Sequence, residues 1–323
     1  MKKLTYLVSA VLAGLGLSTS ANADVSVSGS STLGYTAAGS ETALHTFGSV
    51  SFGLSTTTAS GMTISTGAGI TAETSSAATV DTANSTGTDG VARNVTGWDG
   101  LKFGTSGSTI EIGTDVALAD GVGDVSGVAS DLVDVGMASS DAAGAAVPKD
   151  EGAGISISTS VGGASVSIAY VADSSVDGDT VSDLNGATTS GASAKVSTAV
   201  GPVGVTVAYV THDSASTNDT ESAIAATYAS DMGTVEVGYG SSTGATKGNE
   251  TSVAYSMSLD ADTSLSIGYG TYNTGANDTT HTELALSRSL GGGASIFAEY
   301  INKGGDTTGS ETSSFAVGAT VSF

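Results

Sequence analysis

The sequence contains no cysteine, two prolines, one tryptophan and only nine basic residues. Without cysteine, no disulfide can stabilise the fold, although disulfides are common in exported proteins. Acidic residues outnumber basic ones, and the formal net charge is −23. A nucleic-acid-binding protein is therefore excluded, because it needs a cationic face to offset the phosphate charge. Stability has to come from a regular, fully hydrogen-bonded backbone.

Long apolar runs are also missing, except for one at the N-terminus. Two lysines open this stretch, residues 4–17 are mostly apolar, and the small residues of Ala21-Asn22-Ala23 resemble a cleavage site. About fourteen apolar residues are too few for a membrane-spanning helix, which needs ~20. We therefore predict a cleaved signal peptide at 1–23 and a mature domain at 24–323.

What the mature chain does have is alternation of apolar and small residues with a period of two. Val203, Val205 and Val207 show it, as do Leu265 and Ile267. This period predicts β-strands with one apolar face. The whole mature chain then contains sixteen candidate strands, at approximately 24–37, 44–59, 61–73, 99–105, 108–114, 154–161, 164–173, 189–200, 203–212, 221–230, 234–242, 250–259, 263–273, 280–289, 294–303 and 312–323.

The connections between these strands alternate in length. Tight turns such as Gly162-Gly163 and Gly201-Pro202 alternate with longer connections rich in Asp, Asn, Thr and Gly. Tight turns at one end and longer loops at the other are typical of transmembrane barrels. The predicted fold is an all-β, antiparallel, sixteen-stranded transmembrane barrel.

The charged residues of the strands support a barrel with a wet interior. Almost all of them occupy the parity opposite to the large apolar residues. A charged side chain on the lipid-facing parity would cost ~2–4 kcal/mol at the middle of the membrane. Arg288 is an exception, and it lies close to a tight turn, where its side chain can reach the interface. The predicted lumen-wall residues are Lys102, Glu111, Lys195, Glu236, Glu283 and Glu299.

Six tyrosines lie on the apolar parity near the long-loop end of outward-running strands. Their shared position predicts an aromatic girdle at one membrane interface. These residues are Tyr35, Tyr170, Tyr209, Tyr239, Tyr269 and Tyr300.

The C-terminus has the most specific short pattern, because Phe315, Val317, Val321 and the terminal Phe323 all share one parity. This pattern resembles the general porins of Gram-negative bacteria. The resemblance implies an outer-membrane location, contact with outer-membrane lipid, and a homotrimer. It also implies that the last strand closes the barrel and that the terminal aromatic residue is read by the outer-membrane assembly machinery.

A second resemblance concerns the longest connection, which follows the fifth candidate strand. In trimeric sixteen-stranded porins the corresponding loop folds into the lumen and constricts the pore. The resemblance implies that role for Asp115, Asp120, Asp124, Asp131 and Asp134. Residues 126–138 are predicted to form a short helical turn. The chain departs from the family in having few basic residues to oppose these acids.

Nothing in the sequence calls for catalysis, and no cofactor is predicted. The three histidines lie far apart, and a zinc site or thiol nucleophile is not indicated without cysteine. The Asp-rich segment 173–183 has carboxylates of the kind that Ca²⁺ binds, but we favour simple solvation. The predicted function is passive diffusion of small hydrophilic solutes and ions, with a preference for cations. Two alternatives are a substrate-selective outer-membrane channel and an extracellular adhesin or surface-layer protein built as a β-solenoid.

Overall fold

The computed structural model describes ten segments of the chain. They are residues 23–38, 41–75, 91–96, 100–119, 151–173, 190–213, 218–243, 248–273, 278–305 and 312–323. Among these residues there is no helix with the length and apolar character that a membrane crossing requires.

The described residues form one antiparallel sheet of seventeen strand segments. They are β1 (Ala23–Ala38), β2 (Glu41–Thr57), β3 (Thr63–Ser75), β4 (Val91–Thr96), β5 (Leu101–Gly104), β6 (Ser108–Ala117), β7 (Glu151–Val161), β8 (Ala164–Asp173), β9 (Ser190–Val200), β10 (Val203–Asp213), β11 (Asn218–Ser230), β12 (Gly233–Thr243), β13 (Gly248–Ser258), β14 (Thr263–Asn273), β15 (Asp278–Gly291), β16 (Ala294–Gly305) and β17 (Thr312–Ser322).

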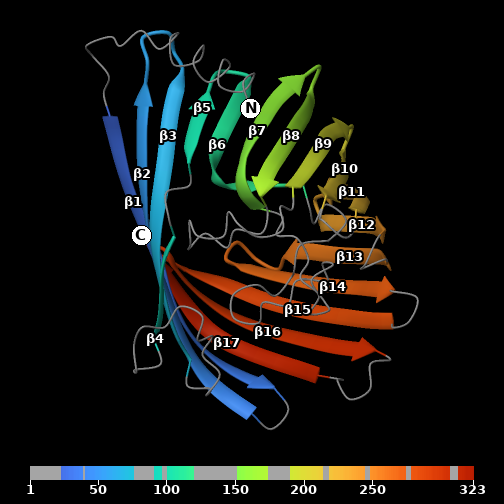
Figure 1. Ribbon diagram of the computed structural model, residues 1–323. Coiled ribbons are helices and arrows are strands. Elements are labelled where there is room, and N and C mark those ends of the chain that lie inside the picture. The colour runs from blue at the N-terminus through green and yellow to red at the C-terminus, as the bar shows by residue number, and fades with distance from the viewer. Residues whose placement is uncertain are drawn as a thin grey trace.

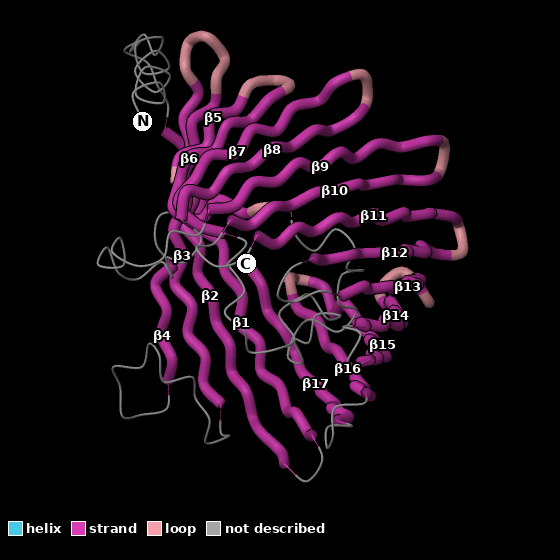
Figure 2. Tube along the Cα trace, turned by 45° about the vertical axis from the view of Figure 1, so that its right-hand side comes forward, coloured by secondary structure: helices cyan, strands magenta, loops and turns pink. Residues whose placement is uncertain are grey.

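The sheet closes on itself, because β1 pairs with β17 on one side and with β2 on the other. Figures 1 and 2 show the strands running around a common interior, with β5–β9 opposite β14–β17. β4 and β5 both pair with β3, at different heights, and so share one strand position. The result is the predicted sixteen-stranded antiparallel barrel.

The strand boundaries agree closely with the prediction in most places. β8 and β14 have the predicted limits, but the fourth strand was predicted only at 99–105, and β4 was missed. β1 and β2 are longer than predicted, and their ladder continues to the pair Ala38 and Glu41. A ladder extends wherever a partner backbone is available, and single-strand patterns do not reveal this.

The two faces of the barrel differ as the alternation predicted. Val207 and Ile267 are 49% and 46% exposed, on the outer face. Lys195 and Glu236 have the opposite parity and are half-buried on the inner face. The apolar and the charged residues thus lie on opposite faces of the sheet, as an alternating strand requires. The six girdle tyrosines share the apolar face and are all exposed.

The tight turns depend on glycine where the backbone enters the left-handed region. Between β7 and β8, Gly162 and Gly163 have φ values of 59° and 87°. Two central residues with positive φ are characteristic of a type I′ hairpin, whose twist matches that of the flanking strands. The sequence pattern predicted this turn, and the backbone confirms it.

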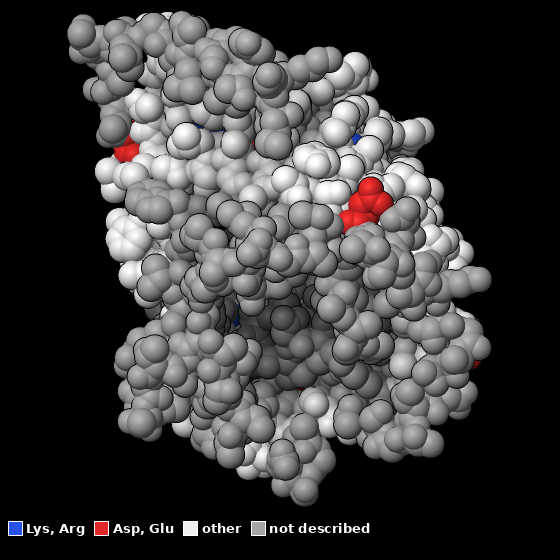
Figure 3. All heavy atoms as spheres, in the orientation of Figure 1, with Lys and Arg blue, Asp and Glu red and all other residues white. Residues whose placement is uncertain are grey.

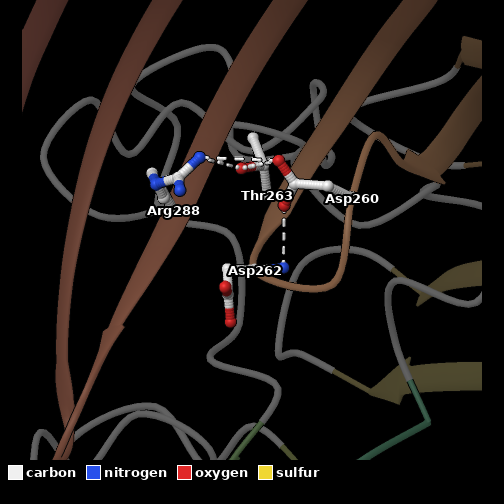
Figure 4. Close-up of polar contacts among 4 residues, drawn as sticks. All are labelled: Asp260, Asp262, Thr263 and Arg288. Carbon is white, nitrogen blue, oxygen red and sulfur yellow. Dashed lines mark hydrogen bonds and ion pairs between the residues drawn. The ribbon is translucent and has the colours of Figure 1, made fainter.

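The turn between β13 and β14 is tied to β15 by a polar cluster (Figure 4). Asp260 accepts hydrogen bonds from the Asp262 backbone N–H at 2.8 Å and from the Thr263 hydroxyl at 3.1 Å. Arg288 donates to Thr263 Oγ1 at 2.9 Å and lies 3.5 Å from an Asp260 carboxylate oxygen. Arg288 shares the parity of the apolar residues of β15, and its side chain reaches the polar groups of the turn, as its position in the sequence suggested.

This cluster holds the pKa of Asp260 below its usual range. The Asp262 N–H makes the largest contribution, followed by the Thr263 hydroxyl, and Arg288 adds its charge. A carboxylate with a depressed pKa in the folded state stabilises that state above the unfolded pKa of ~3.9, and this contribution is lost as the pH falls through the folded pKa.

We therefore expect Asp260→Asn to lower the heat stability of the folded barrel slightly at pH 7 and to leave it unchanged at a pH well below the lowered pKa of Asp260. Unfolding can be followed by heat-modifiable gel mobility at both pH values. The matched control is Asp262→Asn in the same turn, which should have a smaller effect. Equal losses for both variants at pH 7 would mean that the cluster does not stabilise the turn.

Candidate pore and its inner wall

The inner face of the barrel is lined mainly by small and hydroxylated side chains. Hydroxyl groups bond to each other across neighbouring strands, as in Ser158 to Ser167 at 3.0 Å and between Ser197 and Thr206 at 2.9 Å. Figure 3 shows a hollow between the upper and lower halves of the molecule. A polar inner face inside an apolar outer face is the arrangement that a water-filled pore needs.

One ion pair lies on the inner face between β5 and β6. Lys102 Nζ is 3.1 Å from a Glu111 carboxylate oxygen, and the two residues are directly opposite each other in the ladder. Both were predicted as lumen-wall residues. Because their charges neutralise each other, this pair contributes little net field to the interior.

The chain leaving β6 turns onto the inner wall of β8–β10. Val116 and Leu118 are buried in an apolar cluster. The Ala119 backbone N–H donates to the Ser193 hydroxyl at 2.9 Å. A Cβ atom placed on Gly191 would lie 2.5 Å from Leu118, so glycine leaves room for this contact. The segment 116–119 is therefore held against the inner wall. The other members of the cluster are Ala169, Val171 and Val210.

Most of the predicted acidic wall residues lie on one side of the barrel. Glu236 is half-buried on β12. Glu283 on β15 and Glu299 on β16 are only 0% and 3% exposed. Their parity indicated an inward direction, and their burial is a finding of the structure. Lys102 and Lys195 lie on β5 and β9, away from Glu236, Glu283 and Glu299, whereas Glu111 lies directly opposite Lys102.

The predicted constriction residues fall largely outside the described residues. Asp115 belongs to β6, but its side chain lies outside that description. Asp120, Asp124, Asp131 and Asp134 lie outside it altogether. The predicted helical turn at 126–138 does as well. The constriction role of these residues stays a prediction.

The terminal strand lies where its pattern indicated. Phe315, Val317 and Val321 are exposed on the outer face, and Phe323 is 76% exposed. The Phe323 backbone exchanges two hydrogen bonds with Gly29 of β1, at 3.0 and 3.2 Å. The last residue of the chain therefore completes the seam between β17 and β1.

Several inward-facing residues were not singled out by the sequence. His212 and His281 are buried on the inner wall, and so is Glu250 on β13. Phe297 and Ile301 are buried apolar residues on the same inward parity of β16 as Glu299. Their inward parity was readable from the sequence. Their burial was not, because it depends on chain segments far away in sequence.

Among the described residues, no group of three or more His, Asp or Glu side chains is arranged to hold a metal ion. The Asp-rich segment 173–183 falls almost entirely outside the described part of the chain. Simple solvation of its carboxylates stays the prediction, with calcium binding as the alternative.

A sequence profile described as Gram-negative porin matches residues 8–308, which is most of the chain. The chain belongs to the Gram-negative porin family. It is thus an outer-membrane porin, a class of channel proteins, and its closed barrel does not agree with the β-solenoid alternative. No curated protein matches this porin significantly.

Solved porin structures share the fold of this porin at low sequence identity. A loop-deletion mutant of OmpT from Vibrio cholerae has a TM-score of 0.68 at 14% identity, covering 93% of this chain and 99% of the other. OmpT in its trimer form has a TM-score of 0.66 at 13% identity, with the same coverage. A triple mutant of the Rhodopseudomonas blastica porin has a TM-score of 0.61 at 17% identity, covering 93% and 100%.

Proposed function

We propose that this porin is a water-filled channel through which small hydrophilic solutes and ions diffuse passively, with a preference for cations. The observation that carries the proposal is the segregation of the two barrel faces, apolar outside and hydroxyl-lined inside. The outer apolar band is the surface that contacts outer-membrane lipid. The inner face offers solutes hydrogen bonds without a catalytic group, so the protein is not an enzyme in this proposal.

The segment 120–150 is proposed to narrow the channel. Its support is the chain leading into it, because Val116, Leu118 and Ala119 already lie against the inner wall. Residues 115–151 include seven Asp and one Glu against the single basic residue Lys149, which gives 1 − 8 = −7. Fixed negative charge beside a narrow aqueous path raises the local cation concentration.

The remaining parts of the proposal concern maturation and assembly. Residues 1–23 are proposed to be removed as a signal peptide, and the mature barrel is proposed to form a homotrimer. The trimer form of OmpT supports the second point, because this chain shares the OmpT fold over 93% of its length.

Planar-bilayer recordings of the purified, folded protein test the central proposal. We expect stepwise conductance increments that rise with KCl concentration. Saturation by a single nutrient at low concentration would instead favour the substrate-selective alternative. A folded protein that inserts but forms no conducting steps would contradict the proposal.

A further inference from the structure

A groove lies on the inner wall of the barrel near its tight-turn end. It spans β7 to β11 and has a volume of about 360 Å³, within the range of ligand pockets. Five hydroxylated residues of its lining have the inward parity, namely Ser160, Ser165, Ser197, Thr206 and Thr227. The lining contains no aromatic and no charged side chain.

The inward hydroxyl groups of the groove on β8 to β11 follow a continuous diagonal across the strands. Ser165 lies opposite Ser197, and Ser197 lies opposite Thr206, to which it is hydrogen-bonded at 2.9 Å. Thr227 lies opposite Gly204, two residues along β10 from Thr206. The diagonal therefore runs from β8 to β11 and descends toward the tight turns.

Two residues of opposite charge flank the groove without being part of its lining. Lys195 is two residues from Ser197 on the same face of β9, and Glu236 lies directly opposite Thr227 on β12. Both side chains are half-buried. Within the described part of the chain, neither of them forms an ion pair, in contrast to Lys102 and Glu111.

The ladder sets the distance between the two charges. Lys195 and Glu236 are three strand spacings apart, roughly 14 Å, and are offset by four residues along the strands, roughly 13 Å. Their Cα atoms are therefore separated by ~19 Å. An extended peptide advances ~3.4 Å per residue, so about four residues connect the two charged groups.

We infer that this groove binds short zwitterionic peptides during their passage, with Lys195 receiving the carboxylate end and Glu236 the ammonium end. The inference deepens the proposed function and rests on it. The hydroxyl diagonal supplies donors and acceptors for the peptide groups between the two ends. A simple anion would meet only one favourable charge in an otherwise acidic interior, and a neutral sugar would find no aromatic side chain to stack on.

Blocking of single-channel current by tetra-alanine tests this inference. We expect Lys195→Gln and Glu236→Gln each to raise the half-blocking concentration about two- to five-fold, as expected for partly exposed ion pairs. Lys102→Gln is the matched control for Lys195→Gln, because it removes the same charge from the wall far from the groove. It should leave the block unchanged. Tetra-alanine with an acetylated N-terminus and an amidated C-terminus should block more weakly in the wild type.

A charge swap separates binding from a general change of field. Lys195→Glu combined with Glu236→Lys restores both charges in reverse, so tetra-alanine should block again, lying in the opposite direction. Equal block of wild type and both single variants would overturn the inference, as would equal block by the capped peptide. If no channel forms at all, the proposed function fails, and tetra-alanine binding to the folded protein is then measured by calorimetry with the same variants.

Discussion

Deletion of Phe323 is expected to remove most of the folded barrel from the outer membrane while leaving export intact. In the structure the residue exchanges two backbone hydrogen bonds with Gly29. Losing both costs roughly 2 kcal/mol at about 1 kcal/mol per bond. By its resemblance to other porins, the terminal aromatic residue is also proposed to be read by the assembly machinery, and that loss adds to the first.

Two measurements separate the contributions of the seam and of recognition. Heat-modifiable gel mobility of outer-membrane fractions gives the amount of folded barrel in cells, and refolding of the purified chain in detergent gives the intrinsic stability. We expect a large loss in cells and a small loss in detergent. Tyr300→Ala is the matched control, since it removes an outward aromatic ring from the neighbouring strand β16 without touching the C-terminal pattern or shortening the chain.

Either of two results would contradict this prediction. Equal amounts of folded barrel with and without Phe323 in cells would show that the residue is not needed for assembly. An equally large loss in detergent would show that seam stability alone explains the effect, and not recognition. Mass measurement of the exported chain verifies that residues 1–23 are still removed in the variant.

Neutralising the acidic residues of segment 115–151 is expected to reduce the cation preference of the channel. The variant replaces Asp120, Asp124, Asp131 and Asp134 with Asn and lowers the net charge of the segment from −7 to −3. A unit charge ~5 Å from a permeating ion in water contributes ~0.8 kcal/mol. Because each carboxylate attracts a cation and repels an anion by this amount, one such charge already changes the cation-to-anion permeability ratio by roughly ten-fold, and we expect removal of all four to reduce the ratio by at least that much at low salt.

The salt dependence of this effect provides a second observable. The Debye length falls from ~30 Å at 0.01 M to ~3 Å at 1 M salt, so the difference from wild type should shrink as KCl increases. Reversal potentials in KCl gradients measure the ratio. The matched control replaces Asp173, Asp177, Asp179 and Asp183 with Asn and should change the ratio less. Anion preference in the wild type, or equal effects of the two variants, would exclude segment 115–151 as the filter.

The inner wall contributes less to this selectivity than a sum of its charges suggests. Lys102 and Glu111 neutralise each other across β5 and β6. Glu283 and Glu299 are almost fully buried and therefore not directly in contact with an open aqueous path. We accordingly expect the substitutions in segment 115–151 to change the cation-to-anion permeability ratio more than the removal of a single wall carboxylate does.

Much of the barrel was determined by the sequence alone. In an extended chain successive side chains point to opposite faces, so an alternating pattern fixes which residues face in and which face out. This is why the inward positions of Lys195, Glu236 and Glu299 were predictable, as were the outward positions of Val207 and Tyr269. Turn chemistry at Gly162-Gly163 fixed a hairpin for the same local reason.

Contacts between distant segments were decided only by the tertiary structure. No pattern in the sequence predicted that Val116 and Leu118 would pack on β8–β10. Nor did it show that a groove would run between Lys195 and Glu236, because that diagonal depends on the register of four strand pairs. Alternation is a local property of the backbone. Register and inner-wall burial depend on which strands pair with each other, and that pairing is determined only when the barrel closes.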